Sequence, residues 1–214
     1  MHIEILIEDS SGKTLLQALL PQILGSHGDP HSWRLHSYKG IGRLPKGLVS
    51  TGDPSKRILL DQLPKILSGY GKTPGIDAIV VVVDTDDRDC ITFLQELKTM
   101  ANNCGVSSKT IFRLAIEEME SWYLGDRVAL LRAYPKAKKD ILNRYIQDTK
   151  CDTWELLADA VYAGGSAAVK KMGWPLPGQL KHEWAEKIGP LMLINQNSSS
   201  SFCKFRDGLL NLIS

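Results

Sequence analysis

Residues 79–89 read IVVVVDTDDRD, and this stretch constrains the fold more than any other part of the chain. Ile79–Val83 is a continuous apolar run in which four of the five residues are valine. Such β-branched runs are typical of strands buried on both faces, as in a parallel sheet. Four carboxylates follow within six positions, at Asp84, Asp86, Asp87 and Asp89. If the run is a central parallel strand, these acids lie at its carboxyl end, where open α/β sheets place their binding sites.

The first 115 residues alternate between strand-like and helix-like patterns. Strands are predicted at Ile3–Ile7, Trp33–Ser37, Ala78–Val83 and Thr110–Ala115, and helices at Lys13–Leu24, Pro54–Ser68 and Ile91–Asn103. The glycine-rich segment Tyr38–Asp53 is predicted to be a loop. This order predicts an α/β fold with a mostly parallel sheet and helices on both of its faces.

From Ile116 onward the pattern is helical, with helices predicted at Ile116–Leu131, Lys136–Ile146, Thr153–Tyr162, Gly178–Ile188 and Ser200–Ile213. We therefore expect an α/β core over residues 1–115 and a helical region over residues 116–214 that packs on or beside it. No apolar run approaches the roughly 18 residues of a membrane span, and the N-terminus does not resemble a signal peptide. The four cysteines form no close pair. That spacing argues against a zinc module and favours a cytoplasmic protein.

Acidic residues follow two of the predicted strands. Glu8 follows the first strand, and Asp84 and Asp86 follow the third. In a parallel sheet both turns lie at one edge, so the three carboxylates are expected to converge. Converging carboxylates repel each other and coexist most easily around a hard cation such as Mg²⁺ or Mn²⁺. If the backbone is extended there, the alternation Asp84-Thr85-Asp86 sends both acids to one face. The alternatives are a solvated acidic turn and, for Asp87 and Asp89, the polar start of a helix.

Further candidate residues lie in two other segments. Glu117 and Glu120 are three positions apart after the last strand and would share a helix face, although acids are also common in first helical turns. His31–Arg57 carries six Lys and Arg residues against one Asp. Lys39 and Arg43 in this segment, or Lys13, could neutralise phosphate groups. A solvated loop is the alternative interpretation of the same charges.

The turn that ends in Gly12-Lys13-Thr14 resembles the end of a P-loop, which would make the chain a nucleotide-binding ATPase. The full pattern needs glycine where Ile7 stands. Glu8 and Asp9 also lie where backbone N–H groups would have to hold phosphates, and their negative charge opposes that role. We keep this class as a third alternative.

The residues ILIEDSSGK at 5–13 and VDTD at 83–86 resemble the TOPRIM pattern. In that pattern an acid after the first strand and a DxD motif after a later strand assemble a Mg²⁺ site in topoisomerases, primases and OLD-family nucleases. Two further blocks, LAIEEMESWYLGD at 114–126 and SFCKFR at 201–206, resemble a bacterial family of domains of unknown function with a TOPRIM-like core. That family is similar to the nuclease subunit of some phage-defence systems.

The resemblance implies a TOPRIM-like core and a magnesium-dependent nuclease with DNA or RNA as its substrate, and it suggests a role in antiviral defence. Glu8 would be a metal ligand or general base, Asp84 and Asp86 would be metal ligands, Glu120 would complete the metal site, and Lys39 would assist catalysis. The chain departs from the pattern at Asp9, where glycine is usual, and at Gly12, where a second acid is usual. The number of metal ions therefore stays open. The alternative is a regulatory or toxin-like subunit whose latent site a partner ATPase releases.

Overall fold

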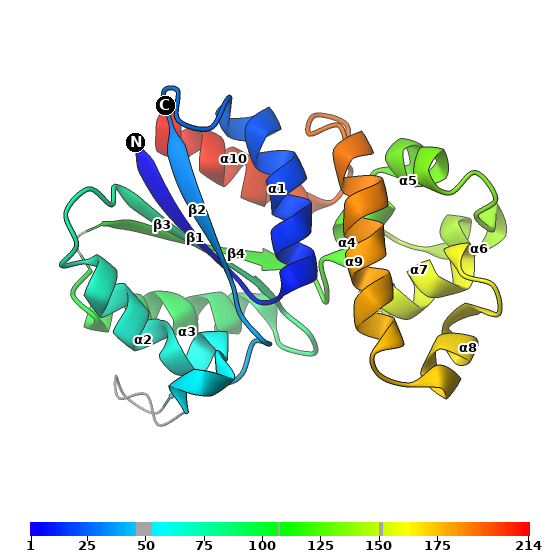
Figure 1. Cartoon of the computed structure of the whole chain (residues 1–214), viewed down its shortest axis with the longest axis horizontal. Coiled ribbons are helices and arrows are strands. Elements are labelled where there is room, and N and C mark those ends of the chain that lie inside the picture. Colours follow the sequence, from blue (N-terminus) through cyan, green and yellow to red (C-terminus); the bar gives the residue numbers. More distant parts are fainter. Residues whose placement is uncertain (46–52, 107, 150–151) are drawn as a thin grey trace.

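The chain forms an α/β unit with a helical extension at one side, as the computed structural model shows (Figure 1). The structure describes residues 1–45, 53–106, 108–149 and 152–214, so residues 46–52 of the predicted loop lie outside the described part. Within the described residues, four strands form one parallel sheet in the order β2-β1-β3-β4. They are β1 (His2–Ile7), β2 (Ser32–Ser37), β3 (Ala78–Asp84) and β4 (Lys109–Ala115). The predicted fold class is confirmed.

The valine-rich run is the central strand β3, which pairs with β1 on one side and β4 on the other. Ala78 through Val83 are all buried, because helices cover both faces of the sheet. Alternate residues serve opposite faces. Val80 and Val82 join one apolar cluster, whereas Val81 and Val83 join the other. This two-sided burial explains why the strand lacks the polar alternation of a half-exposed strand.

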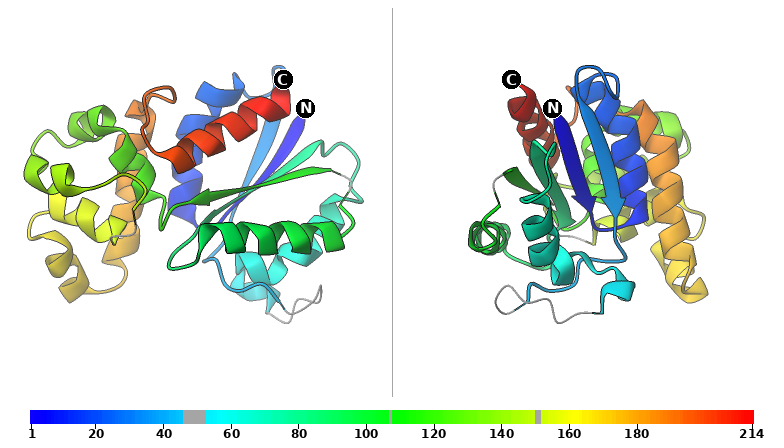
Figure 2. Two further views of the ribbon diagram at one scale, coloured as in Figure 1. Left: turned by 180° about the vertical axis from the view of Figure 1, so that it is seen from behind. Right: turned by 60° about the vertical axis from the view of Figure 1, so that its left-hand side comes forward.

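Different helices cover the two faces of the sheet (Figures 1 and 2). One face packs against α2 (Leu59–Tyr70) and α3 (Cys90–Asn103) through a cluster that includes Leu63, Leu67 and Leu97. The other face packs against α1 (Ser10–Leu24) and α10 (Ser200–Ile213). α10 is the last helix of the chain, yet it lies against α1 and β4.

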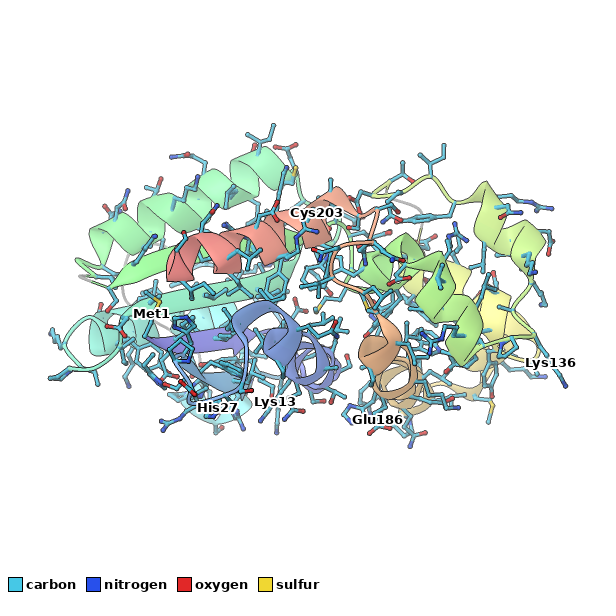
Figure 3. All side chains as sticks on the ribbon, turned by 90° about the horizontal axis from the view of Figure 1, so that it is seen from above. Met1, Lys13, His27, Lys136, Glu186 and Cys203 are labelled. Atoms are coloured by element: carbon cyan, nitrogen blue, oxygen red, sulfur yellow. The ribbon has the colours of Figure 1, made fainter. Side chains whose placement is uncertain are left out.

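The remaining helices extend to one side of the sheet. They are α4 (Glu120–Gly125), α5 (Arg127–Ala133), α6 (Lys139–Arg144), α7 (Thr153–Val161), α8 (Gly165–Met172) and α9 (Leu176–Ile188), followed by the short 3-10 turn η2 (Gly189–Leu191). A second 3-10 turn, η1 (Pro54–Lys56), directly precedes α2. α9 packs beside α1, as the view from above also shows (Figure 3). No helix in the described residues is long and apolar enough to cross a membrane.

The two C-terminal blocks of the TOPRIM-like resemblance pack against each other. Trp122 is fully buried, with its ring 5.0 Å from that of Phe205 and 5.5 Å from that of Phe202. Its indole N–H donates to the Ser201 hydroxyl at 2.9 Å. The aromatic residues of these blocks are therefore core residues, and they join the helical extension to the sheet.

Several predicted helices differ from the observed ones. The predicted helix Ile116–Leu131 is wrong as a single element. The observed helix α4 begins only at Glu120, and Asp126 separates it from α5. The Asp126 carboxylate caps α5 by accepting from the Ala129 N–H at 2.9 Å. The predicted helix Pro54–Ser68 is also divided, because Arg57 adopts a left-handed conformation (φ 53°) between η1 and α2. α8 was not predicted, since the pair Gly164-Gly165 at its start indicates a turn.

Candidate functional site

Three acidic side chains meet at the carboxyl end of the sheet. Glu8 directly follows β1, Asp84 is the last residue of β3, and Glu120 begins α4 shortly after β4. The register pairs Ile7 with Val82, which brings the two strand ends together. The Asp84 backbone N–H then donates to Glu8 Oε2 at 3.3 Å. The predicted convergence of Glu8 and Asp84 is therefore present, and Glu120 lines the same pocket.

The pocket also contains one basic side chain, Lys181 of α9. Its ammonium lies 2.9 Å from Glu118 Oε1 and 3.5 Å from Glu120 Oε2. The free volume of the pocket is ≈ 10 Å³. That volume is close to the lower limit for a single water molecule. The site is consequently a narrow, charged cavity between the sheet and the helical extension.

Lys181 was not among the predicted site residues. It lies on the predicted helix Gly178–Ile188, nearly 100 positions after Asp84, and no local motif marks it. Its place depends on α9 packing beside α1, at whose N-terminus the pocket lies. Such a contact between distant helices is set by tertiary packing and leaves no signal in the local sequence.

Burial makes the charges of this pocket costly. It raises the pKa of Glu8 to about 7, and the negative charges of Asp86 and Asp9 act in the same direction. Burial likewise raises the pKa of Glu120 to about 7, against the opposing charge of Lys181. The pKa of Asp84 is raised well above its usual value by burial and by Glu8. A nearby positive charge stabilises the ionised form of each of these carboxyl groups.

Lys181 supplies part of that charge. Burial alone would lower the pKa of its ammonium, but Glu120, Glu118 and Asp84 raise it above the usual value. Lys181 therefore stays charged, and one ammonium faces a pocket that holds several carboxyl groups. The site has an excess of potential negative charge, as expected where a cation or a proton is to be bound.

Asp9 and Gly12 determine how α1 begins. Asp9 is the N-cap of α1, and its carboxylate accepts from the Gly12 N–H at 2.7 Å and the Ser11 hydroxyl at 2.8 Å. A Cβ on Gly12 would lie 2.8 Å from Ile7 Cγ1 and 2.9 Å from Met119 Sδ, so the position has no room for the second acid of the TOPRIM pattern. The Asp9 carboxylate also occupies the helix N-terminus that a P-loop would offer to phosphates.

Asp86 lies apart from the other carboxylates. The strand ends at Asp84, and Asp86 has a left-handed conformation (φ 46°), so the extended geometry expected for Asp84-Thr85-Asp86 is absent. The Asp86 carboxylate forms an ion pair with Arg88 at 2.9 Å. Together with Arg43 these two residues line a neighbouring open pocket. Asp86 remains close enough for its charge to raise the pKa of Glu8.

Thr85 and Glu117 hold the ends of β3 and β4 together. Thr85 is fully buried, and its hydroxyl accepts from the Glu117 N–H at 2.7 Å. Glu117 has a left-handed backbone (φ 60°) and precedes α4, so Glu117 and Glu120 do not share a helix face as expected. Its carboxylate instead accepts from the backbone N–H groups of Asp152 and Thr153 at the start of α7.

Two other candidates lie outside the carboxylate pocket. Lys39 is exposed and does not line the carboxylate pocket. The loop that carries it is nevertheless adjacent to the site, because the Gly40 N–H donates to the Glu8 carbonyl at 3.1 Å. Asp89 is the N-cap of α3 and accepts from the Thr92 N–H at 2.9 Å. Its predicted role at a helix start is confirmed.

A scan of protein-family models and searches of curated proteins and of solved structures found no match to this chain. As the side chains stand, the described residues contain no group of three or more His, Cys, Asp and Glu that could hold a metal ion. Four acids line the pocket, namely Glu8, Asp9, Asp84 and Glu120, and the Asp84 backbone N–H donates to the Glu8 carboxylate. Carboxylate oxygens are the ligands that hard cations prefer in proteins.

Proposed function

We propose that this chain is a metal-dependent nuclease of TOPRIM type that hydrolyses phosphodiester bonds in DNA or RNA. One observation carries the proposal: Glu8, Asp84 and Glu120 come from three separate segments and line one pocket at the carboxyl end of a parallel sheet. Structural acids seldom gather in this way, because their mutual repulsion and burial destabilise the fold. Carboxylates with raised pKa values in a cleft are instead typical of functional sites.

Glu8, Asp84 and Glu120 would hold Mg²⁺ or Mn²⁺, and Asp86 would add negative charge from the adjacent turn. The bound ion would supply Lewis acidity toward a phosphate and lower the pKa of a water molecule. The chain itself would orient the substrate. Lys181 faces the pocket from α9, and Lys39 lies on the loop next to Glu8, so both could bind phosphate oxygens.

An exposed aromatic side chain at the start of α9, the helix that carries Lys181, supports a nucleic-acid substrate. Trp174 is 81% exposed just before α9. Its ring covers Gly178. A Cβ added to Gly178 would lie 3.0 Å from the Trp174 indole. Gly178 is three positions before Lys181 and shares its helix face. A stacking surface and the carboxylate pocket therefore lie along one side of α9, as binding of a single strand would require.

The test is cleavage of single-stranded DNA, duplex DNA and RNA by purified protein with Mg²⁺, Mn²⁺ or EDTA. Glu8→Gln and Asp84→Asn should abolish divalent-dependent cleavage and weaken Mn²⁺ binding in calorimetry. Glutamine at position 8 retains an oxygen that can accept from the Asp84 N–H, so folding should persist. Glu186→Gln is the matched control, since Glu186 is an exposed residue of α9. Full activity in either pocket variant would contradict the assignment.

We propose as a second candidate that the site is latent within a complex and is released by a partner ATPase. The closed geometry favours this version. A pocket of ≈ 10 Å³ that already holds the Lys181 ammonium cannot admit a phosphodiester unless α9 or the Glu8 turn moves. Partner binding is one source of such a movement. Under this candidate the isolated chain binds Mn²⁺ weakly and cleaves nothing, and Lys181→Met alone increases metal affinity. Robust cleavage by the isolated monomer would exclude it.

A further inference from the structure

The outer edge of the sheet at β4 is open. β4 pairs with β3 on one side and has no strand on the other within the described residues. The Ala115 carbonyl accepts from the Thr85 N–H, so the backbone groups of Ala115 face β3. Backbone groups alternate in direction along a strand. Those of Thr110, Phe112 and Leu114 therefore face outward. Apart from the Phe112 carbonyl, which accepts from Arg113, an added strand could pair with them.

A groove lies along this edge, between α3 and α10. Its volume is ≈ 280 Å³. Figure 2 shows β4 between these two helices in the view from behind. On the α3 side the groove is lined by the apolar residues Ile91 and Leu94, with Gln95 and Lys98 further along the helix, and Ile91 is 77% exposed.

The opposite side of the groove is basic. Arg113 lies against Gly208 of α10, where a Cβ would be 2.0 Å from its Nη2. Its Nη1 donates to the outward carbonyl of Phe112 at 2.8 Å, which places the guanidinium at the open edge. The Arg113 Nε has no hydrogen-bond partner among the described residues. Lys204 of α10 also lines this side, Lys98 adds a positive charge from α3, and none of the described lining residues of the groove is acidic.

We propose that this groove binds an extended acidic segment of another protein as a fifth strand of the sheet. Side chains alternate between the two faces of an added strand. A segment with alternating apolar and acidic residues would place its apolar side chains against Ile91 and Leu94 and its carboxylates toward Arg113 and Lys204. Main-chain hydrogen bonds would give affinity, and the two unlike faces would give specificity.

A second copy of this chain fits the groove poorly. Pairing of β4 with the β4 of another copy would bring Lys98, Arg113 and Lys204 close to their own counterparts, and like charges across an interface are repelled. The groove is also independent of the carboxylate pocket, because the two share no lining residue. Binding of a segment in the groove is therefore independent of the proposed nuclease activity.

The test uses the full chain and labelled peptides of about seven residues, the length of a typical strand. A peptide in which valine and glutamate alternate should bind saturably in fluorescence anisotropy. We expect its affinity to exceed that of the valine–lysine peptide at least tenfold. A central proline should abolish binding, because it removes a donor from the ladder.

The double variant Lys98→Glu and Lys204→Glu should reverse the preference between the two peptides. Both side chains are exposed, so the fold should be retained. The control is Lys136→Glu with Lys139→Glu, at the far end of the helical extension, which should leave the preference unchanged (Figure 3). Absence of saturable binding, equal binding of both peptides, or an unchanged preference in the groove variant would overturn the proposal. So would a dimer whose formation the peptide prevents, since a second copy would then be the occupant.

Discussion

At the scale of single residues, Lys181 has the largest effect on the charge of the pocket. It is the basic residue that faces Glu118, Glu120 and Asp84, and its side chain is only 21% exposed. A buried carboxylate that loses its cation is left with an unfavourable charge. The stability of the metal-free protein should therefore depend strongly on this one ammonium group.

Lys181→Met keeps most of the apolar stem and removes the charge. We expect it to lower the free energy of unfolding by about 3 kcal/mol at pH 8, because breaking a buried ion pair is strongly destabilising. The loss should be smaller at pH 5.5, where the carboxyl groups take up protons. Lys187→Met on the same helix is the control. Its ion pair with Glu183 is exposed, so the cost should stay below about 1 kcal/mol. Urea unfolding measures both, and equal losses would contradict the assigned role of Lys181.

The raised pKa values of Glu8 and Glu120 predict a pH dependence of stability. Both are about 7 in the folded protein, against 4.5 for the unperturbed group. Between these values the folded protein binds more protons than the unfolded chain, so the free energy of unfolding falls as pH rises from 4.5 to 7. The contribution is present below pH 4.5 and is lost above 7. Each group can contribute at most on the order of 3 kcal/mol.

Under the proposed function, a divalent ion should offset the free energy of unfolding that is lost as pH rises. We expect Mn²⁺ to raise the melting temperature more at pH 8 than at pH 5.5, since the ion must displace protons at the lower pH. Glu8→Gln should reduce the difference, whereas Glu186→Gln should not. Thermal denaturation with and without the ion measures the effect. A shift of the same size at both pH values would show that the ion binds elsewhere.

At the scale of elements, the sequence predicts strands better than helices in this chain. Each observed strand begins within one residue of its predicted start, because runs such as Ile79–Val83 have a composition that few other structures accommodate. The helix boundaries after Ile116 were predicted less well. There the breaks come from residues that bond to distant segments: Glu117 caps α7, and Asp126 accepts from the Leu193 N–H.

The residues of the candidate site also divide into those that the sequence predicts and those that depend on tertiary contacts. Glu8 and Asp84 could be predicted because the ends of parallel strands share an edge, whereas Glu120 was expected in the site only from the TOPRIM-like resemblance. Asp86 could not be placed, since its left-handed backbone depends on the contact between its N–H and the Glu117 carbonyl at 2.9 Å. Lys181 could not be found either, because α9 reaches the pocket only through tertiary packing.

Asp126 allows a direct test of this view of the helix breaks. Its buried carboxylate accepts from the Ala129 N–H at the start of α5 and from the Leu193 N–H beyond α9, both at 2.9 Å. Asp126→Ala should lower the free energy of unfolding by about 2–3 kcal/mol, because a cap is lost and a second N–H is left without its partner. Asp89→Ala removes an exposed cap at α3 and should cost about 1 kcal/mol. Chemical denaturation measures both free energies of unfolding. Losses of similar size in the two variants would contradict a bridging role for Asp126.

At the scale of the whole molecule, the carboxylate pocket joins the sheet to the helical extension. Its walls come from β1, β3, α1, α4 and α9, and α10 returns from the extension to pack on α1 and β4. The site is thus completed only when both regions are folded together. Movement of α9 would open it and would carry Trp174 along, because this residue immediately precedes the helix.

Trp174 therefore provides a test of substrate binding that is separate from metal chemistry. Under the proposed function, Trp174→Ala should weaken binding of a single-stranded oligonucleotide about tenfold, since stacking contributes roughly 1–3 kcal/mol per base. Trp174→Phe should retain most of the affinity. Met172→Ala is the control, because Met172 is 68% exposed nearby but offers no aromatic ring. Anisotropy in EDTA at two salt concentrations separates stacking from phosphate contacts, which weaken with salt. If the alanine variants at 172 and 174 lose affinity equally, the surface contributes through apolar area and not through base stacking.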